Sequence, residues 1–263
     1  MRICVLISAL NQEAEKLPRK MGLKTDAVIV NQCDRESKEE LSYRNRKILL
    51  INNTERGVGR SRNLALDHAW GDVVLFSDED IVYEEDYHAR IQQAFRRRPD
   101  ADILLFNVRV NPDRRTYWNE RSKRIHWYNC GRYPTFCAAV KLDRLRESGI
   151  RFSTLFGGGA PYSNGEDSLF FMDCIKKGFK VVAVSAVIGT EKTRKSTWFN
   201  GYDEKFFFDR GVLFHFMYGK FAPLWALRFV LVKGKVMCRE IKRYKALKLL
   251  LSGVEKGKSL CRE

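Results

Sequence analysis

Short apolar runs separated by stretches of helical pattern constrain this chain more than any other feature. Five such runs fall within the first 110 residues, at 3–8, 26–31, 48–52, 72–77 and 102–108. Each is apolar at most positions, which is typical of strands buried on both faces of a sheet. Helical patterns lie between them at 13–21, 60–70 and 86–97. This alternation predicts an α/β fold, in which a Rossmann-like mixed sheet, parallel for the most part, has helices on both faces.

The pattern loosens after Val110 and then resumes. We expect a short strand at 135–140, a short helix at 142–147, a helix at 168–177 and a last strand at 181–187. Beyond Thr190 the sequence becomes aromatic and basic. A chain of 263 residues is long enough for one large α/β domain and an appendage. We therefore expect a domain over residues 1–190 and a helical extension over residues 191–263.

Polar side chains follow three of the expected strands, at residues 8–11, 31–34 and 77–80. Sheets of this kind bind ligands beyond the carboxyl ends of their strands. In the second of these segments, Asn-Gln-Cys-Asp at 31–34, the amide and carboxylate groups could bind the edge of a nucleobase. Because Asn and Asp also favour turns, an ordinary turn is the alternative.

Three consecutive acids, Asp78, Glu79 and Asp80, end the fourth apolar run. Such a triplet is self-repelling unless a cation or a donor-rich ligand balances it. Carboxylate oxygens suit Mg²⁺ or Mn²⁺, which bind substrate phosphates and retain water molecules. A metal site is therefore one interpretation, and a solvated turn is the other.

Two further motifs favour a ligand site. Glycines 57 and 59, with arginines 56, 60 and 62, precede the helical pattern at 60–70; arginine side chains and helix N-terminal amides both bind diphosphates. Gly165, Glu166 and Asp167 follow a glycine-rich loop and begin another helix. A carboxylate there could act as a general base, or it could only cap the helix.

In this order and spacing, these elements resemble family 2 glycosyltransferases of the GT-A fold. The matching segments are residues 3–11, 28–34, 56–66, 73–81 and 165–171. The resemblance covers about the first 190 residues and implies that they form a nucleotide-sugar-binding catalytic domain. It also implies an inverting transfer of a sugar from a nucleotide-sugar donor, expected to be a UDP-sugar, to an acceptor hydroxyl.

The resemblance assigns a role to each motif. Asp80 is the expected metal ligand of a DxD motif, with Asp78 as its first acid, and the metal is Mn²⁺ or Mg²⁺. Asp167 is the expected catalytic base, with Glu166 beside it. The expected contacts to the donor nucleotide are Ser8, Asn11, Asn31 or Asp34, Arg62, Asp78 and Glu79, the last of these near the ribose.

The sequence departs from the family pattern at two places. The family usually has Asp near the position of Asn31, so the group that binds the base is left open. Many members also have a His after the last core strand, whereas residues 188–192 read Ile-Gly-Thr-Glu-Lys here. Lys192, Arg194 or Lys195 could neutralise the leaving diphosphate instead.

The excess positive charge of the chain is concentrated in its last part. Of a net charge of +16, residues 191–263 hold +10, from 17 Lys and Arg against 7 Asp and Glu. The same segment contains long apolar stretches at 206–208 and 212–232. We expect an amphipathic helix at 233–251 that lies in the plane of an anionic membrane surface. A helical hairpin packed on the catalytic domain is the alternative.

Cysteine usage and the N-terminus bear on location. Seven cysteines with no Cys-x-x-Cys pair favour a reducing compartment, and the apolar run at 3–7 is too short for a signal peptide. We expect a cytoplasmic enzyme on the inner face of the cell membrane. Its acceptor would be a glycan or a lipid-linked sugar, in surface polysaccharide or glycolipid synthesis. Trp118, Trp127, Tyr128 and Tyr133 could stack on acceptor sugar rings or simply pack.

Two other functions remain open at this point. A nucleotidyltransferase would also need acids, a metal and a nucleotide, although the Gly-Glu-Asp helix start favours sugar transfer. A nucleic-acid-binding protein could use the basic tail. We nevertheless expect no nucleic-acid partner, because phosphate binding alone does not require the long apolar stretches of the tail.

Overall fold

The computed structural model describes residues 1–112, 115–192 and 201–260. Within them, ten strands form one mixed sheet in the order β3-β4-β2-β1-β5-β9-β7-β10-β6, and β8 pairs beside β10. The strands are β1 (Ile3–Leu10), β2 (Asp26–Gln32), β3 (Ser37–Tyr43), β4 (Arg46–Asn53), β5 (Val73–Asp78), β6 (Ile81–Tyr83), β7 (Ile103–Arg109), β8 (Lys123–Arg124), β9 (Ala138–Lys141) and β10 (Val181–Glu191). All of the predicted strands are therefore present, although the one predicted at 135–140 begins only at Ala138, because residues 135–137 form a short 3-10 helix.

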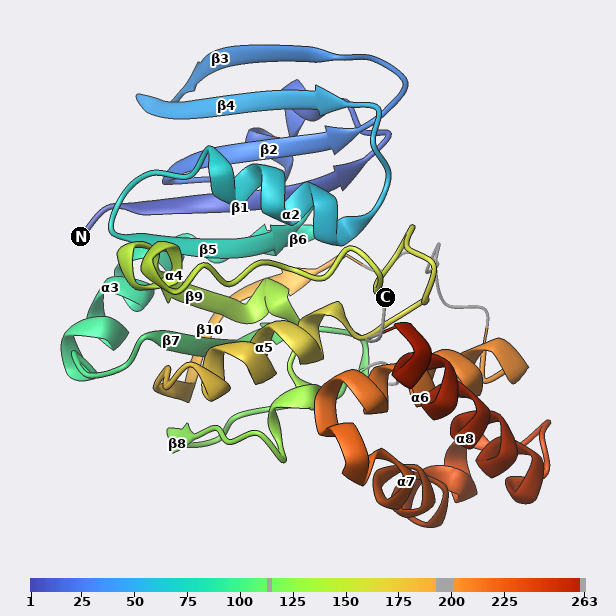
Figure 1. Ribbon diagram of the computed structural model, residues 1–263. Helices are drawn as coiled ribbons and strands as arrows, with labels where there is room; N and C mark the ends of the chain where they lie inside the picture. Colours follow the sequence, from blue (N-terminus) through green and yellow to red (C-terminus); the bar gives the residue numbers. More distant parts are fainter. Residues whose placement is uncertain (113–114, 193–200, 261–263) are drawn as a thin grey trace.

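The parallel half of the sheet contains the site-forming strands. β1 pairs in parallel with β2 on one side and with β5 on the other, and β2 pairs in parallel with β4. Residues 3–9 of β1 are all buried, as the continuous apolar run predicts. The carboxyl ends of β1, β2, β4 and β5 thus meet at one edge of the sheet (Figure 1).

The sheet is mixed, as predicted. β9 lies between β5 and β7 and is antiparallel to both, and β6 is antiparallel to β10. The edge strand β3 forms a hairpin with β4 through Arg44 and Asn45, which have positive φ angles of 51° and 59°, as a tight hairpin turn requires. β3 escapes prediction because it is polar and half exposed, which is how edge strands avoid pairing with other chains.

Helices lie on both sides of the sheet. In Figure 1, α2 (Val58–Asp67), α4 (Leu142–Ser148) and α5 (Glu166–Lys176) lie in front of it. The short α1 (Leu17–Lys20) lies behind β2 and β4, and α3 (Tyr87–Arg97) packs on β10. α2 packs on β1 and β2 and begins directly beyond their carboxyl ends. α5 begins at the same edge of the sheet.

Three helices form the extension: α6 (Glu204–Tyr218), α7 (Ala222–Met237) and α8 (Arg243–Leu260). The helix predicted at 233–251 is wrong in its bounds, because residues 238–242 separate α7 from α8. α6 contributes Val212, Leu213 and Met217 to the core of the α/β domain. α6 therefore packs on that domain, as the alternative to a lipid-bound tail predicted. Within the described residues, no helix is long and apolar enough to cross a membrane.

α6 and α8 approach each other so closely that their backbones touch. A Cβ atom added to Gly211 would lie 2.0 Å from the carbonyl oxygen of Leu250, and one added to Gly253 would lie 2.1 Å from that of Phe208. Only glycine fits at these positions, because neither contact can be relieved by moving a flexible side chain.

This contact predicts a stability loss for a very small substitution. Gly253→Ala should lower the free energy of unfolding by about 1–3 kcal/mol, the usual cost of overpacking, even though Ala is the better helix former. Gly234→Ala on α7 is the matched control, because its added Cβ would meet only the Arg243 side chain, at 3.3 Å. Urea unfolding measures both variants. Equal stability of the two would contradict the backbone contact.

Candidate active site

A cavity of about 180 Å³ opens at the strand edge described above. Its walls come from the ends of β1, β2 and β5, the starts of α2 and α5, and the segment around Pro134. The lining residues are Ser8, Ala9, Leu10, Gln32, Val58, Arg62, Asp78, Glu79, Pro134, Phe136, Gly158, Glu166 and Asp167. Six of the predicted site residues, from four separate segments of the sequence, are therefore in one place.

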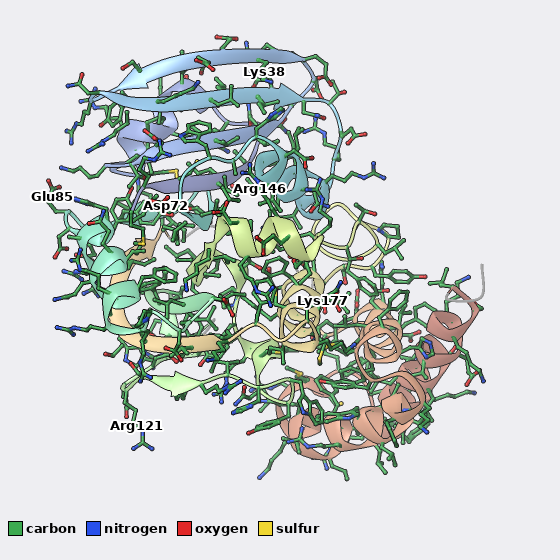
Figure 2. All side chains as sticks on the ribbon, turned by 60° about the vertical axis from the view of Figure 1, so that its left-hand side comes forward. Lys38, Asp72, Glu85, Arg121, Arg146 and Lys177 are labelled. Atoms are coloured by element: carbon green, nitrogen blue, oxygen red, sulfur yellow. The ribbon has the colours of Figure 1, made fainter. Side chains whose placement is uncertain are left out.

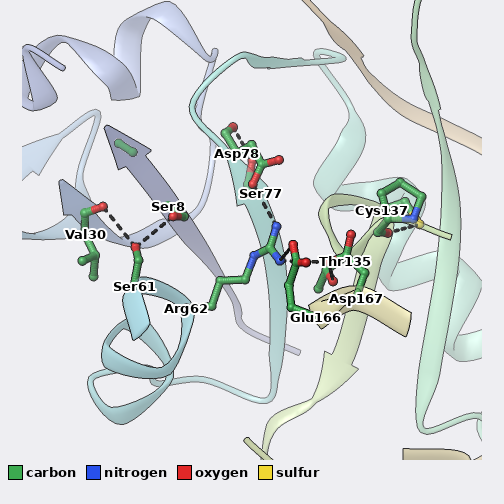
Figure 3. A network of polar contacts seen from close by, with 12 residues as sticks. Ser8, Val30, Ser61, Arg62, Ser77, Asp78, Thr135, Cys137, Glu166 and Asp167 are labelled. Carbon is green, nitrogen blue, oxygen red and sulfur yellow. Dashed lines mark hydrogen bonds and ion pairs between the residues drawn. The ribbon is translucent and has the colours of Figure 1, made fainter. Parts of the chain in front are cut away.

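The side chain of Arg62 connects the acids of this cavity (Figure 3). It projects from α2 and is only 4% exposed. Its Nη1 donates to Asp167 Oδ1 at 2.9 Å and to Glu166 Oε1 at 3.4 Å, and its Nη2 donates to Asp78 Oδ1 at 3.2 Å. One guanidinium thus joins the end of β5 to the start of α5. The sequence resemblance gave Arg62 a role toward the nucleotide and did not indicate these contacts.

The charges of this cluster do not cancel. Burial alone would lower the pKa of Arg62, but the charges of Asp167, Asp78 and Glu166 raise it well above its usual value. Burial, followed by repulsion from Asp167, raises the pKa of Glu166 to about 7. Three carboxyl groups around one guanidinium leave the cavity rich in negative charge. Such a site favours a cation or a proton donor, and Glu166 exchanges its own proton near neutral pH.

Asp167 is held through one of its two oxygens. The buried hydroxyl of Thr135 donates to Oδ1, the same oxygen that Arg62 contacts. Among the described residues no hydrogen bond reaches Oδ2, and the side chain is 26% exposed on the cavity wall. The carboxylate is therefore fixed in orientation while one oxygen remains open to a substrate. This arrangement suits a general base.

The acidic triplet lies where a metal site would need it. Asp78, Glu79 and Asp80 are all partly buried at the end of β5, and the first two line the cavity. Across the described ranges, no group of three or more His, Cys, Asp or Glu side chains is arranged to hold a metal. A Mg²⁺ or Mn²⁺ site in which one or two carboxylates are completed by substrate phosphates and water molecules fits these residues.

Lys192 lies beside the acidic triplet. Its backbone N–H donates to the carbonyl oxygen of Asp80 at 2.8 Å, directly after the end of β10. Of the three cations predicted to replace the missing His, Lys192 is therefore near the acids. The other two, Arg194 and Lys195, lie outside the described residues.

Of the residues predicted to contact the nucleotide, Ser8 lines the cavity, whereas Asn31 is buried behind it. Ser8 lies in the cavity wall, where its hydroxyl donates to Ser61 at 2.9 Å. Asn31 is only 1% exposed. Its amide nitrogen donates to the backbone of Gln12 and to Asn52, and its oxygen accepts from the backbone of Gln12. These bonds occupy both amide protons, so Asn31 ties together the ends of β1, β2 and β4.

Arg56 organises the remaining predicted contacts. Its guanidinium donates to Asn11, to the Asp34 carboxylate and to the backbone carbonyl of Gln32. Asn11 and Asp34 are thus together at the strand edge, but neither lines the cavity described above. Asp34 has a side chain that is 94% exposed, so a ligand can reach it.

Two residues, Gln32 and Thr135, were not among the individually predicted site residues, although Gln32 belongs to the segment 31–34 considered for the nucleobase. Gln32 lines the cavity, accepts from the backbone N–H of Gly57 at 2.7 Å and donates to Ser8 at 3.4 Å. Thr135 holds Asp167 and is fully buried. Gln32 lies between Asn31 and Asp34, so its position at a strand end was the available signal. Thr135 lies in a segment read only as a strand, and no sequence pattern indicates its partner 32 residues away.

Among the aromatic residues considered for acceptor binding, some are buried and others are exposed. Tyr133 is buried and donates to Asn119 at 2.8 Å, so it packs inside the domain. Trp127 and Tyr128 are exposed. The Trp127 ring lies 5.9 Å from that of Trp225 on α7, which brings the extension against the segment that leads to Thr135.

The chain matches a known protein family over more than half of its length. Residues 6–154 match the sequence model described as Glycosyl transferase family 2. No curated protein sequence matches the chain.

Solved structures with a similar fold include S. aureus TarS 1-349 in complex with UDP-GlcNAc, at a TM-score of 0.65 and 15% identity, with 99% of this chain and 84% of that chain covered. The mannosyltransferase PcManGT from Pyrobaculum calidifontis, in complex with GDP-Man and Mn²⁺, gives a TM-score of 0.52 at 16% identity, with 98% and 75% covered. The GT-A fold predicted from the sequence is confirmed, and the similarity to TarS extends through α6, α7 and α8.

Proposed function

Because the chain belongs to glycosyl transferase family 2 and is a glycosyltransferase, we propose a metal-dependent, inverting transfer from a nucleotide-sugar donor, with a UDP-sugar expected, to an acceptor hydroxyl. The observation that supports this most is the Asp167 carboxylate, held through Oδ1 by Arg62 and Thr135 at the wall of the strand-end cavity. Family membership removes the nucleotidyltransferase alternative.

The proposed reaction is a single displacement. The acceptor oxygen forms a bond to the anomeric carbon while the bond from that carbon to the diphosphate breaks. Asp167 Oδ2 takes the proton of the acceptor hydroxyl as the oxygen attacks, and the bonding electrons of the broken bond leave with the diphosphate. Attack from the opposite face inverts the anomeric carbon, so an α-linked donor gives a β-linked product.

Arg62 and Glu166 support the base in this proposal. The Arg62 guanidinium fixes the orientation of the Asp167 carboxylate through Oδ1. Burial raises the pKa of Glu166 to about 7, so at lower pH Glu166 carries a proton and adds no second negative charge beside the base. The environments of adjacent acids can give them separate roles, and here Glu166 is the more deeply buried of the two.

The leaving group requires positive charge, for which the chain offers two sources. Asp78 and Asp80 would hold Mn²⁺ or Mg²⁺, which acts as a Lewis acid on the departing diphosphate. Lys192, bonded through its backbone to Asp80, would bring a cationic side chain to the same place. Ser8, Asn11, Asp34 and Glu79 remain the proposed contacts to the donor nucleotide, whereas the role of Asn31 would be to support the strand ends.

A substitution of Asp80 tests the metal. Asp80→Asn should abolish the extra thermal stabilisation that Mn²⁺ gives to complexes with UDP-sugars, because it removes an anionic metal ligand and keeps the shape of the side chain. Asp143→Asn, at the exposed start of α4, is the matched control. A thermal-shift panel of nucleotide sugars with and without Mn²⁺ measures both. If Asp80→Asn retains the full Mn²⁺ effect, Asp80 does not hold the metal.

The acceptor in this proposal is a glycan or a lipid-linked sugar in surface polysaccharide or glycolipid synthesis. The rings of Trp127 and Tyr128 are exposed beside α7. They support a sugar-binding surface there, since aromatic faces pack well against the apolar faces of sugars. The proposed location is the cytoplasmic side of the cell membrane.

A further inference from the structure

One face of α7 exposes a continuous set of apolar side chains. With Phe221, which immediately precedes the helix, this face, called the α7 face below, consists of Phe221, Leu224, Leu227, Leu231, Val232 and Val236. Leu224 is 65% exposed and Leu231 is 70% exposed. Apart from the adjacent pair Leu231 and Val232, the spacings are three and four residues, which places these side chains on one half of the helix surface. Scattered exposed leucines are normal in proteins, but a contiguous row indicates a binding surface.

The opposite side of α7 is already occupied. Ala222, Ala226 and Val230 are buried in a second hydrophobic cluster with residues of α6 and α8. These small residues recur every four positions, so they lie along the side opposite the α7 face. The α7 face therefore points away from the rest of the molecule, where α7 lies at its lower edge in Figure 1.

The charge of this helix identifies the kind of partner. Residues 220–237 include Lys220, Arg228, Lys233 and Lys235 and contain no Asp or Glu. No hydrogen bond or ion pair engages the last three within the described ranges, and Arg228 instead lies over the Trp225 ring at 5.2 Å. Apolar side chains interleaved with unpaired cations fit a partner that has an apolar interior and anionic groups at its surface. The long stems of Arg and Lys can lie beside the apolar residues while their charges reach the anionic groups.

A second copy of the chain fits this surface poorly. A dimer through two α7 faces would bring together two sets of four cations with no acid on either helix. Like charges placed close together in an interface oppose association. An anionic lipid bilayer meets both the apolar and the charged part of the surface.

We propose that α7 docks in the plane of an anionic lipid bilayer, with the α7 face in the boundary between headgroups and acyl chains and its four cations at the lipid phosphates. This assigns membrane binding to α7, whereas the sequence pattern had placed it at residues 233–251. The assignment is independent of the catalytic roles proposed above.

Vesicle flotation of the full-length chain tests the proposal with three variants. The apolar variant is Leu227→Gln with Leu231→Gln. The charge variant is Arg228→Gln with Lys233→Gln and Lys235→Gln. The control, Lys38→Gln with Arg96→Gln and Arg97→Gln, removes the same charge from β3 and α3; Figure 2 shows Lys38 on the outer strand, at the opposite end of the molecule from the three-helix extension. All of these side chains are exposed, so the variants should fold.

The parent and the control should bind vesicles of phosphatidylglycerol and phosphatidylcholine and bind phosphatidylcholine alone weakly. The charge variant should lose about fivefold in partitioning per removed charge at low salt, and this difference should shrink as salt screens the charges. The apolar variant should lose at least about tenfold at low and at high salt, because apolar burial is not screened.

Three outcomes would overturn the proposal. The first is equal vesicle binding by the apolar variant and the parent. The second is equal loss in the control and the charge variant, which would show attraction by net charge alone. The third is a parent that ignores anionic vesicles and forms a dimer in light-scattering measurements that the apolar variant does not form, which would identify the partner as a second copy of the chain.

Discussion

Asp167→Asn should lower the turnover of sugar transfer by about 10²–10⁴-fold, the usual contribution of a general base, while donor affinity stays nearly unchanged. The amide keeps the size of the side chain and can still accept from Arg62 and Thr135, but it cannot take the proton of the acceptor hydroxyl. Steady-state kinetics with a UDP-sugar, together with donor titration in the absence of acceptor, separates these two effects.

Two further substitutions sharpen this result. Asp173→Asn removes a carboxylate from the other half of α5 and should leave turnover close to that of the parent. If Asp167→Asn lowers turnover less than about tenfold, well below the range for a general base, another group must take the proton. Glu166 is then the first candidate, and Glu166→Gln should carry the large loss instead.

Arg62→Leu should lower the free energy of unfolding by about 3–5 kcal/mol near pH 8, the cost of leaving buried charges without their partner. The guanidinium is 4% exposed and contacts the carboxyl groups of Asp78, Glu166 and Asp167. Without it, these carboxyl groups repel one another in a partly buried cluster. Urea unfolding over a range of pH measures the effect.

The pH dependence of this loss follows from the protonation of the acids. The pKa of Glu166 is raised from 4.5 to about 7 in the parent, and Arg62 is one of the groups that hold it down, so the substitution raises it further. A carboxyl group whose pKa is raised by folding favours the folded state at low pH, and this stability is lost as pH rises through the folded pKa. The Glu166 part of the deficit of Arg62→Leu should therefore be small well below pH 7 and grow as pH rises through about 7 toward the higher pKa of the variant.

Arg60 provides the matched control on the same helix. It is half exposed and lies 3.5 Å from Glu55, an arrangement worth at most about 1 kcal/mol, so Arg60→Leu should change stability little at any pH. A loss for Arg62→Leu that does not vary with pH would mean that packing, and not charge, explains the role of Arg62.

The sheet was predictable from the sequence where burial leaves a clear pattern. β1, β2, β4, β5 and β7 begin and end within two residues of the predicted runs, because strands covered on both faces are apolar along their length. β3 and β6 lack this pattern. β3 has the sequence SKEELSY at an exposed edge, and β6 is a three-residue strand directly after the acidic triplet. Both are fixed by pairing with β4 and β10, which no local pattern reveals.

The residues of the site were easier to predict than their partners. Asp78 and Asp167 were identified because acids after an apolar run and at a helix start, in this order and spacing, resemble the family pattern. That Arg62 joins them depends on contacts across 16 and 105 residues. For Asn31 the position was predicted correctly but the role was not. Its position at a strand end suggested a ligand contact, but the neighbouring strand ends use both of its amide protons.

The touching backbones of α6 and α8 have a consequence for which acceptors the enzyme can reach. Helices in contact at Gly211 and Gly253 cannot slide past each other without losing that contact, and α6 is built into the core of the catalytic domain. Because α7 packs against α6 and α8, its position relative to the strand-end cavity is rigid. With α7 docked on a bilayer, Asp167 would stand at a fixed height above the lipid, so hydroxyls at one distance from the membrane would be glycosylated and those nearer or farther would be passed over.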